Sequence, residues 1–596
     1  MTKLARCLFF QLLLSFCSQA SIAQQPPAEK SGDKTNIFRQ PEELPATAEP
    51  RLVEKNVALV GPENTAWDAK ASLFRPAFRF ADDDQRKSAE AVTGHGAAGE
   101  LVRQWQMEGT AAGLWGVLYD NRDRDHSNLP IQEFPQLTGV EYSDEAKQAG
   151  LDMGLQLRTL FAQPTFGNSS TAATNGPFWR SQTRIGQVDF QRVDRQYQQY
   201  VNNHLYLYPE HRDYDPGHNG KDSGYGDTYP ANTPYVITSQ GSSYTDQPFL
   251  HAVACTLAGF QPATRDKLVE SKLLIPAVQM IFRRSNKQVA TDEDYLTGKA
   301  HPPVFQGEQL DLERMVRLAH EIQPDEIPPM IQLQVVKEDE FRRGIHYFEP
   351  VPTEKLFDTP AAIARVWRST ARERKIVVTA ATSYDANNRP LKFHWAVLQG
   401  RPERIDIQPL KEDGSLVEIT LQWHERFPIA PPSETERSKM ESNRIDIGAF
   451  AHNGSHYSAP GFVTFYCLDD ETRKYNAAGQ PEVIEYKSLA KGGNYADPAV
   501  HTLRDFTDEY HYDETGELTG WTRIRGAERE FFTAHGHLLV EKDSLGRATK
   551  ARPVIYVVKD FQPGKAPYLE QIAEDVILVY EYATDADRVG KAVLLP

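Results

Sequence analysis

The sequence predicts a multidomain α+β protein, with an N-terminal α/β domain, an antiparallel β-sandwich and a β-rich C-terminal region. At 596 residues the chain is too long for a single hydrophobic core, since one domain usually holds about 100–200 residues. Strand-like and helix-like segments alternate between about 101 and 370, which is typical of α/β packing. Alternating apolar and polar residues dominate from about 374 onward. We therefore expect domains at 53–370, 371–470 and 471–596.

The first 23 residues have the three parts of a secretory signal peptide. Lys3 and Arg6 precede a mostly apolar core from Cys7 to Phe16, and small residues lead to a cleavage site near Ala23. This core is too short to cross a bilayer, and no later stretch reaches the roughly 20 apolar residues that a membrane span needs. We expect a secreted or periplasmic protein, with no membrane span in the mature chain.

Composition limits the partners of the mature chain. Residues 24–52 are rich in Pro, Ala and Glu without an apolar period, so we expect a disordered leader there. The net charge of −16 repels phosphate backbones, which argues against nucleic acid as a partner. Cleavage would leave two cysteines, Cys255 and Cys467, both within apolar segments. Buried, unpaired thiols are favoured, but a bridge stays open, because pairing depends on a Cα separation below about 7 Å.

The α/β domain contains several elements with clear local signals. Its best supported helix, 246–260, opens with an acid, carries Pro248 in its first turn and closes near Gly259. Apolar spacing predicts further helices at 144–161, 264–274, 277–285 and 310–322, with Pro276 separating the second from the third. Strands are predicted at 114–121, 204–209, 234–240 and 328–338.

The middle region resembles a known type of β-sandwich. The runs "TAATSYDANNRPLKFHWAVLQG" and "NRIDIGAFAHNGSHYSAPGFVTFYC" are similar to a PKD-type immunoglobulin-like sandwich over about residues 375–470. The resemblance implies that Trp395 is the aromatic residue buried between the sheets and that Asn453-Gly454 forms a hairpin turn needing positive φ. It also implies a spacer or adhesion module. The N-terminal half resembles no family.

Three C-terminal stretches, at 475–487, 510–523 and 540–556, have a common sequence pattern. Each places a Tyr or an Asp before a glycine-containing turn and a strand after it, and each resembles a degenerate YD repeat of bacterial surface proteins. Hairpins are the expected consequence.

The stretch "YVITSQGSSYTD" ends a predicted strand immediately before the helix at 246–260. Gly241-Ser242-Ser243 resembles a nucleophile elbow, with Ser243 as nucleophile, but Thr245 replaces the second glycine of that motif. N-capping of the helix by Ser243, Thr245 or Asp246 accounts better for these residues. A third alternative is an anion site at the turn, with Ser243 as a ligand-binding residue.

Three further loops carry candidate site residues. Residues 208–230 offer Asp213, Asp215 and Asp222 as oxygen ligands for Ca²⁺, and His211 with Asp213 as catalytic groups or transition-metal ligands. The same composition is typical of a polar, turn-rich surface loop, which is the favoured interpretation. No other cofactor is predicted.

The other two loops point to acid–base chemistry and to sugar binding. Residues 119–130 concentrate acidic residues beside a histidine, which makes Asp123 and His126 an acid–base pair or members of a salt-bridge cluster. Around 166–182, Trp179 can stack on a sugar ring while Asn168 forms hydrogen bonds with the sugar hydroxyls. Ordinary turns have the same composition, so a turn without a ligand is the alternative.

These observations support two functions. The first is an envelope or extracellular binding protein whose ligand is a polysaccharide or a protein. The alternative is a secreted hydrolase with its site in the loops between 120 and 246. The sequence does not decide whether the chain is an enzyme.

Overall fold

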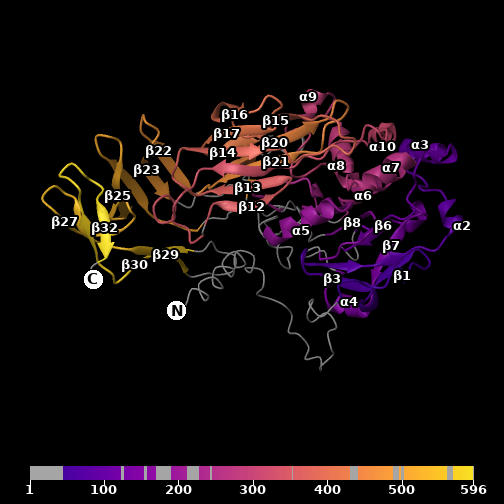
Figure 1. Ribbon diagram of the computed structural model, residues 1–596, viewed down its shortest axis with the longest axis horizontal. Helices are drawn as coiled ribbons and strands as arrows, with labels where there is room; N and C mark the ends of the chain where they lie inside the picture. The colour runs from indigo at the N-terminus through magenta and orange to yellow at the C-terminus, as the bar shows by residue number, and fades with distance from the viewer. Residues whose placement is uncertain are drawn as a thin grey trace, which may run out of the picture.

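The computed structural model describes most of the chain from residue 45 to residue 594. The described ranges are 45–122, 127–152, 158–169, 190–210, 227–241, 244–351, 353–429, 440–486, 496–497, 502–559 and 568–594. The described part is elongated, with the helix-rich N-terminal region at one end and the C-terminal strands at the other (Figure 1). The expected signal peptide and most of the expected leader lie outside the described residues. The last two residues of that leader form strand β1 (Arg51–Leu52), which pairs with β5 (Phe78–Arg79).

A six-stranded parallel sheet forms the centre of the N-terminal region. Its strands lie in the order β10-β9-β8-β6-β7-β2, and all neighbours are parallel. Every residue of β8, β9 and β10 is buried, as expected when both faces of a parallel sheet are covered. The strands are β2 (Val57–Val60), β6 (Leu118–Asn121), β7 (Thr138–Tyr142), β8 (Thr165–Asn168), β9 (His204–Pro209) and β10 (Val236–Ser239).

Helices cover one face of this sheet, and a smaller apolar cluster covers the other. The larger core joins residues of β6, β8, β9 and β10 to the buried faces of the helices. On the opposite face, α4 (Asp144–Gln148) and the hairpin of β3 (Thr65–Asp68) and β4 (Leu73–Pro76) pack on β2 and β7. The larger helices are α3 (Gly96–Met107), α5 (Phe190–Tyr200), α6 (Gln247–Gly259), α7 (Pro262–Glu270), α8 (Leu274–Arg284) and α10 (Leu312–Glu321).

Two predicted helix boundaries are wrong. The helix expected at 144–161 ends at Gln148, where Gly150 takes the left-handed conformation (φ 72°) that terminates helices. Pro276 does not separate two helices but lies in the first turn of α8, where its missing N–H has no helical partner to lose. None of the helices among the described residues is long and apolar enough to cross a membrane.

The middle region is a β-sandwich. A sheet ordered β11-β14-β17-β16 faces a sheet ordered β12-β13-β21-β20-β15, with an apolar core between them. All neighbours are antiparallel except β13 and β21. The strands are β11 (Gln334–Glu338), β12 (Lys355–Thr359), β13 (Ala362–Trp367), β14 (Glu373–Thr379), β15 (Lys392–Gln399), β16 (Ile405–Pro409), β17 (Leu416–Gln422), β20 (Arg444–His452) and β21 (Gly461–Cys467).

The sandwich departs from the sequence expectations in two ways. Strands β11, β12 and β13 precede residue 370, so the two sheets draw on both sides of the expected domain boundary. The fully buried tryptophan of this core is Trp367, whereas Trp395 is only partly buried and donates a hydrogen bond from Nε1 to the Gly414 carbonyl (3.0 Å). Gly454 does take positive φ (97°), as expected for the turn.

The sandwich and the parallel-sheet region share one core. Phe357, Ala362 and Phe450 of the sandwich belong to the apolar cluster that covers the helical face of the parallel sheet. Between the two regions, the Tyr235 hydroxyl lies 2.5 Å from the Thr359 hydroxyl.

The C-terminal region is a nine-stranded sheet in the order β22-β23-β24-β25-β26-β27-β28-β31-β32, with the separate hairpin β29-β30. The three stretches expected to form hairpins do so, at β22–β23, β24–β25 and β27–β28. The bounds are β22 (Glu471–Tyr475), β23 (Pro481–Tyr486), β24 (Thr507–Tyr512), β25 (Leu518–Arg525), β26 (Glu528–Thr533), β27 (Leu538–Lys542), β28 (Ala548–Arg552), β29 (Val554–Lys559), β30 (Tyr568–Ala573), β31 (Leu578–Glu581) and β32 (Lys591–Leu594).

The turns of the three hairpins are built in the same way. In the last of them, Asp543 Oδ1 accepts hydrogen bonds from the backbone N–H groups of Leu545 and Arg547, both at 2.9 Å. Gly546 follows with φ 79°. Asp513 and Asn476 accept equivalent pairs of bonds in the other two turns. An Asp or Asn side chain that satisfies its own turn, followed by a glycine at positive φ, explains why these stretches look alike in sequence.

Candidate functional site

The strand order of the parallel sheet fixes where a ligand site is expected. The chain passes from β6 to β7 on one side, then crosses to β8 on the other side of β6 and continues outward to β9 and β10. The connections that leave β6 and β8 therefore diverge beyond the carboxyl ends of these two strands. In open α/β sheets this position is where ligands bind.

A buried carboxylate lies at this point. Asp120, in β6, is 0% exposed; its Oδ1 accepts a hydrogen bond from the Tyr142 hydroxyl at 2.9 Å. Its Oδ2 accepts from the Tyr206 hydroxyl at 2.5 Å and from Arg122 Nε at 2.6 Å. Burial raises the pKa of both tyrosines well above the ordinary value, so their hydroxyls stay protonated and able to donate. Three donors thus offset the cost of burying one carboxylate.

Arg122 is the polar group of this cluster that retains unused hydrogen-bonding capacity. Its backbone N–H donates to the Asn168 carbonyl (2.9 Å), which fixes the end of β6 beside β8, and its guanidinium lies 5.0 Å from the centre of the Tyr206 ring. Burial by itself lowers the pKa of Arg122, but Asp120 outweighs it and raises that pKa well above the ordinary value. Nη1 and Nη2 are buried, and no described residue accepts a hydrogen bond from them.

More carboxylates are buried along the same edge. Glu210 follows β9; its Oε1 accepts from the backbone N–H of Gly241 (3.1 Å), and its carbonyl accepts from that of Asp227 (2.7 Å). Asp227 in turn accepts a hydrogen bond from the Tyr208 hydroxyl of β9. Asp246, at the start of α6, accepts from the Ser127 hydroxyl. The edge therefore carries several carboxylates held by neutral donors.

Most of the site residues predicted from the sequence lie outside the described residues. These are Asp123, His126, Trp179, His211, Asp213, Asp215, Asp222 and Ser243. In sequence, each follows the carboxyl end of β6, β8, β9 or β10. These four strands are parallel, so their carboxyl ends lie at one edge of the sheet.

Asn168 is the predicted ligand-binding residue that the structure describes. It is the last residue of β8, it is 0% exposed, and its Oδ1 accepts a hydrogen bond from the Tyr119 hydroxyl at 3.0 Å. Asn168 thus positions the ends of β6 and β8 relative to each other. Its side chain does not reach the surface as the sugar-binding expectation requires.

The turn between β10 and α6 supports part of the sequence interpretation. Gly241 takes φ 117°, and a side chain there would lie 2.5 Å from Thr245 Cγ2, so Thr245 fills the space beside this glycine. Asp246 occupies the N-cap position of α6, but it makes no side-chain capping bond and binds Ser127 instead. The acid that opens the helix therefore joins α6 to the connection after β6.

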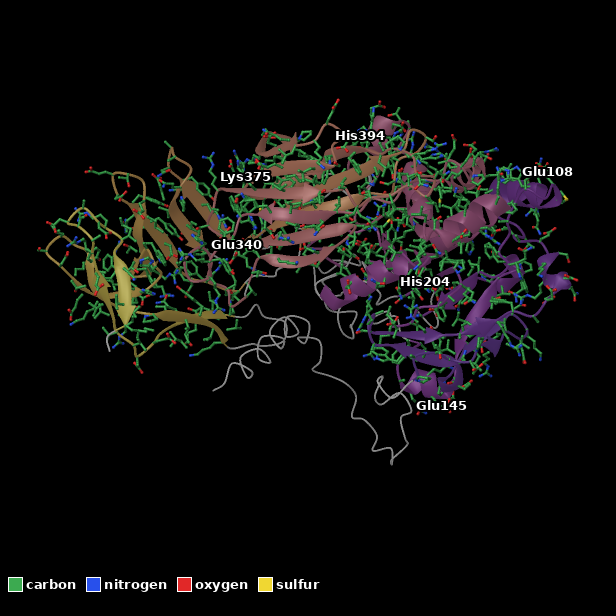
Figure 2. All side chains as sticks on the ribbon, viewed as in Figure 1. Glu108, Glu145, His204, Glu340, Lys375 and His394 are labelled. Carbon is green, nitrogen blue, oxygen red and sulfur yellow. The ribbon has the colours of Figure 1, made fainter. Side chains whose placement is uncertain are left out.

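A histidine at the start of β9 has a purely structural arrangement. His204, labelled in Figure 2, accepts a hydrogen bond at Nε2 from the backbone N–H of Phe161 (2.9 Å), and its Nδ1 lies 2.7 Å from the Asn202 carbonyl. Burial lowers the pKa of His204 to about 4, so the ring is neutral at physiological pH. Both ring nitrogens are used, which leaves none for a ligand.

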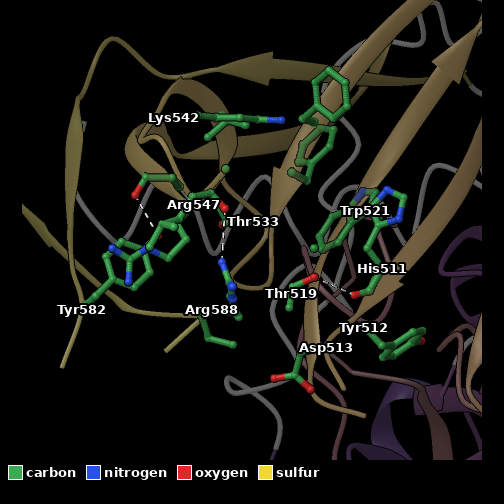
Figure 3. Close-up of a pocket in the computed structure, with 18 of the residues that line it drawn as sticks. His511, Tyr512, Asp513, Thr519, Trp521, Thr533, Lys542, Arg547, Tyr582 and Arg588 are labelled. Carbon is green, nitrogen blue, oxygen red and sulfur yellow. Dashed lines mark hydrogen bonds between the residues drawn. The ribbon is translucent and has the colours of Figure 1, made fainter. Parts of the chain in front are cut away.

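A second concave surface lies in the C-terminal sheet, with a cavity of about 620 Å³ between β24–β28 and the segment 582–589 (Figure 3). Of its aromatic residues, Trp521 is buried, and one face of each of two more exposed rings is occupied by a cation. Lys542 Nζ lies 4.3 Å from the centre of the Phe531 ring, and Arg547 lies 4.2 Å from that of Tyr582. Because sugar stacking needs a free ring face, this cavity is a weaker site than the edge of the parallel sheet.

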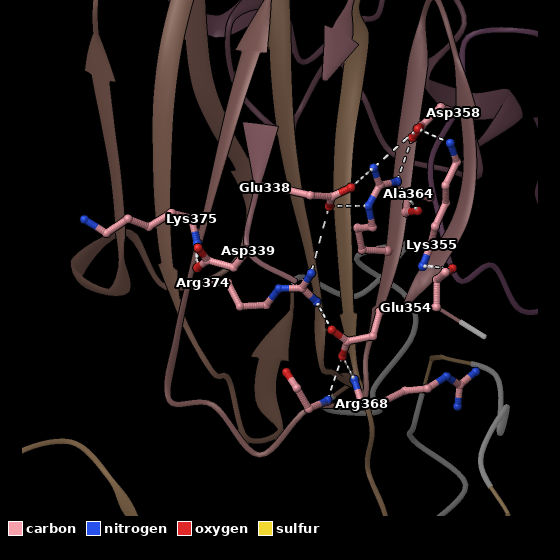
Figure 4. A network of polar contacts seen from close by, with 12 residues as sticks. Glu338, Asp339, Glu354, Lys355, Asp358, Ala364, Arg368, Arg374 and Lys375 are labelled. Atoms are coloured by element: carbon pink, nitrogen blue, oxygen red, sulfur yellow. Dashed lines mark hydrogen bonds and ion pairs between the residues drawn. The ribbon is translucent and has the colours of Figure 1, made fainter. Parts of the chain in front are cut away.

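A charged cluster in the sandwich has a structural explanation (Figure 4). Arg365 is 1% exposed and pairs with Glu338 (2.8 Å) and Asp358 (2.6 Å). Arg374 pairs with Glu354 (2.9 Å), whose carboxylate also accepts from backbone N–H groups at the end of β13. These ion pairs connect β11, β12, β13 and β14, which are the first four strands of the sandwich in chain order.

One group among the described residues has the spacing of transition-metal ligands. It consists of His95, Glu133 and His251, whose ligand atoms lie within 4.8 Å of one another. Sequence reasoning missed this group, because the three residues are far apart in the chain and form no spacing motif.

The two cysteines, Cys255 and Cys467, are free and buried, so they do not form the disulfide bridge that the sequence left open.

Comparisons with known proteins give no family. No protein-family model and no curated protein matches the chain. Among solved structures, a nucleoside hydrolase-related hypothetical protein from Saccharophagus degradans, described as associated with carbohydrate metabolism, is 11% identical. The alignment covers 55% of this chain and 66% of that chain, with a TM-score of 0.17. At that TM-score the similarity carries no argument about fold or function.

Proposed function

We propose that the chain acts outside the cytoplasm as a binding protein for a polysaccharide or protein ligand, held beyond the carboxyl ends of β6 and β8. The PKD-like sandwich and the YD-like hairpins would then serve as spacer and presentation modules. The first step of this proposal is export, which rests on the N-terminal 23 residues. Mass spectrometry of the protein recovered from the periplasm or medium should find a chain that begins at Gln24.

The observation that carries the proposal is the pair of unused guanidinium nitrogens on Arg122. A buried N–H group without a protein acceptor costs free energy unless water, an ion or a ligand satisfies it. Nη1 and Nη2 lie at the switch point of the sheet and can donate to a carboxylate or to sugar oxygens. The ligand chemistry that fits is an oxygen-rich group, such as an acidic sugar or a peptide carboxylate.

Hydrolysis is the second candidate function. It is favoured by the buried carboxylates of Glu210, Asp227 and Asp246 at the same edge, because two carboxyl groups in different environments can serve as general acid and general base. The loops between 120 and 246 would supply the remaining catalytic groups. A calcium site at Asp213, Asp215 and Asp222 is a proposal that rests on the sequence alone, because these residues lie outside the described residues.

A binding screen tests the first function. The exported chain is presented to glycan and peptide arrays, and any hit is measured by isothermal titration calorimetry with wild type, Arg122→Met and the exposed control Arg342→Ala. Loss of one charge-assisted contact should weaken binding by about 10- to 100-fold in Arg122→Met only. Equal affinity in all three proteins would overturn the assignment of the site to this edge.

Product analysis of the same ligands tests hydrolysis. If the chain is a hydrolase, the ligand is cleaved and Glu210→Gln lowers the rate by about 10²-fold or more, because a general acid or base contributes at least that much. Binding without cleavage by wild type would support the first function. Retention of full cleavage by Glu210→Gln would exclude this residue as the acid or base.

A further inference from the structure

The side chains of His95, Glu133 and His251 converge from three separate segments. His95 is the N-cap residue of α3, Glu133 lies in the short 3-10 helix η3 (Ile131–Glu133), and His251 lies in the second turn of α6. The ring centres of the two histidines are 4.6 Å apart at 85°, and His95 Nε2 is 3.0 Å from Glu133 Oε2. All three ligand atoms lie within 4.8 Å of one another.

The backbone around His95 is built to hold this position. Gly94, His95 and Gly96 take φ values of 90°, 62° and 55°, so three successive residues are left-handed. That conformation costs a non-glycine residue about 1–2 kcal/mol. The Arg103 guanidinium stabilises the turn by donating to the carbonyl of Gly94 (3.1 Å). Backbone strain held in place by surrounding contacts is a feature of functional positions.

The segment with Glu133 is attached to the same turn. The backbone N–H of Thr93 donates to the Glu133 carbonyl (2.8 Å), and the Thr93 hydroxyl donates to the Gln132 carbonyl (3.0 Å). Phe134 then stacks on the His95 ring, with centres 5.1 Å apart. Glu133 and His95 are therefore positioned by the fold and not only by their own attraction.

One ring nitrogen of each histidine makes no hydrogen bond within the described residues. His95 Nε2 and His251 Nε2 are buried, and neither has a hydrogen-bond partner among the described residues. Glu133 Oε2 approaches His95 Nε2 to 3.0 Å without forming a hydrogen bond with it.

From this geometry we propose that His95, Glu133 and His251 bind a divalent transition-metal ion, with Zn²⁺ as the best fit. Two imidazole nitrogens and one carboxylate oxygen are a zinc ligand set that leaves a fourth position for water or a substrate. Ligand atoms around tetrahedral zinc are about 3.3 Å apart, given metal–ligand distances near 2.0–2.1 Å. Side-chain rotations that bring these atoms closer by up to about 1.5 Å would therefore complete the site. Ca²⁺ and Mg²⁺ prefer oxygen ligands and do not suit it.

The metal would connect the helices to the connection that leaves β6. Residues Ser127 and Asn128 of that connection contact Asp246 and Gln247 at the start of α6, and Glu133 meets His251 one turn further along. A bound ion would therefore fix the segment next to Asp123 and His126. This inference does not depend on the proposed ligand-binding function.

Metal analysis of the full chain tests the site directly. Tag-free protein is dialysed against chelator, titrated with Zn²⁺ in a calorimeter and analysed by plasma mass spectrometry after buffer exchange. Wild type should retain about one equivalent of zinc per chain. The variants His95→Asn, Glu133→Gln and His251→Gln should bind about 100-fold more weakly or not at all, since each removes a direct ligand. Asparagine tolerates the left-handed backbone of position 95.

His394→Asn is the matched control, because His394 lies on β15 of the sandwich next to another histidine, His452 (Figure 2). It should bind zinc as wild type does. A Co²⁺ titration gives a second measurement, because Co²⁺ in a tetrahedral site absorbs strongly in the visible range. Wild type should show this absorption and the three ligand variants should not. The proposal is overturned if wild type holds less than a tenth of an equivalent of zinc, or if the ligand variants bind zinc as tightly as wild type. Loss of binding in His394→Asn alone also overturns it, because that result would identify a surface site.

Discussion

Arg523→Met should destabilise the C-terminal sheet more than any surface substitution there. Arg523 of β25 and Asp508 of β24 are both 0% exposed, and they form a bidentate pair through Nε–Oδ1 (2.8 Å) and Nη2–Oδ2 (2.7 Å). The guanidinium also donates to the Tyr556 hydroxyl (2.9 Å) and lies 3.7 Å from the centre of the Phe506 ring. Methionine keeps the apolar contacts but leaves Asp508 buried without its counter-charge.

The expected loss is about 3–5 kcal/mol, the usual cost of removing one partner of a buried ion pair. The loss should depend on pH. Burial raises the pKa of Asp508, and Arg523 partly opposes this, so the variant should raise that pKa further. A carboxyl group with a raised folded-state pKa takes up its proton more readily when folded, so the penalty is full at neutral pH and shrinks as pH falls. Replacing both charges, in Asp508→Asn/Arg523→Met, should recover most of the stability.

Hydrogen exchange of peptides from β24 and β25 measures the opening of this sheet without requiring the whole chain to unfold in one step. A loss of about 3–5 kcal/mol corresponds to exchange about 140- to 3,700-fold faster at pH 7.5, given a factor of ten for each 1.4 kcal/mol. The effect should be smaller at pH 5 and in the double variant. An acceleration below about tenfold, or one that is the same at both pH values, would refute the reasoning.

Two further predictions follow from burial and backbone geometry. Gly520→Ala should lower the stability of the sheet by about 3 kcal/mol or more, because Gly520 has φ 150° and the new Cβ would lie 2.1 Å from the Phe532 carbonyl oxygen. Gly546→Ala should lower it by about 1 kcal/mol, because Gly546 has φ 79° and its Cβ would meet open space. The same exchange measurement compares them, and equal losses would contradict the steric argument. Burial raises the pKa of both Cys255 and Cys467 to about 12, so neither thiol should react with iodoacetamide at pH 8 until the chain unfolds; mass spectrometry detects the label, and rapid labelling of the native protein would disprove their burial.

Elements with strong local signals could be predicted from the sequence. Strand β9 has the bounds 204–209 that its apolar run indicates, and α6 lies within the expected helix. The hairpin at Asp543 follows from an acid and a glycine at fixed spacing. The helix expected from 144 to 161 failed because apolar spacing continues past Gly150, whose left-handed backbone ends α4. Periodicity alone does not show such an ending.

The candidate site was predicted only in part. The cluster after β6 stood out in sequence because acids, arginines and a histidine crowd into 119–130. Its organisation did not, because Asp120 acquires Tyr142 and Tyr206 as partners only when β6, β7 and β9 lie in one sheet. Asn168 looked like a loop residue but is a buried link between two strands. Trp367 takes the buried position that was expected for Trp395, because β13 belongs to the sandwich.

The sequence by itself determined the local elements of this protein, namely where an apolar period marks a strand or helix and where glycine and acidic residues set a turn. These depend on residues within a few positions of one another, so they can be read along the chain. Only the tertiary structure decided which loops share the carboxyl edge of the parallel sheet, and that His95, Glu133 and His251 meet beside α6. Such meetings depend on strand order and helix packing, which bring together residues more than a hundred positions apart.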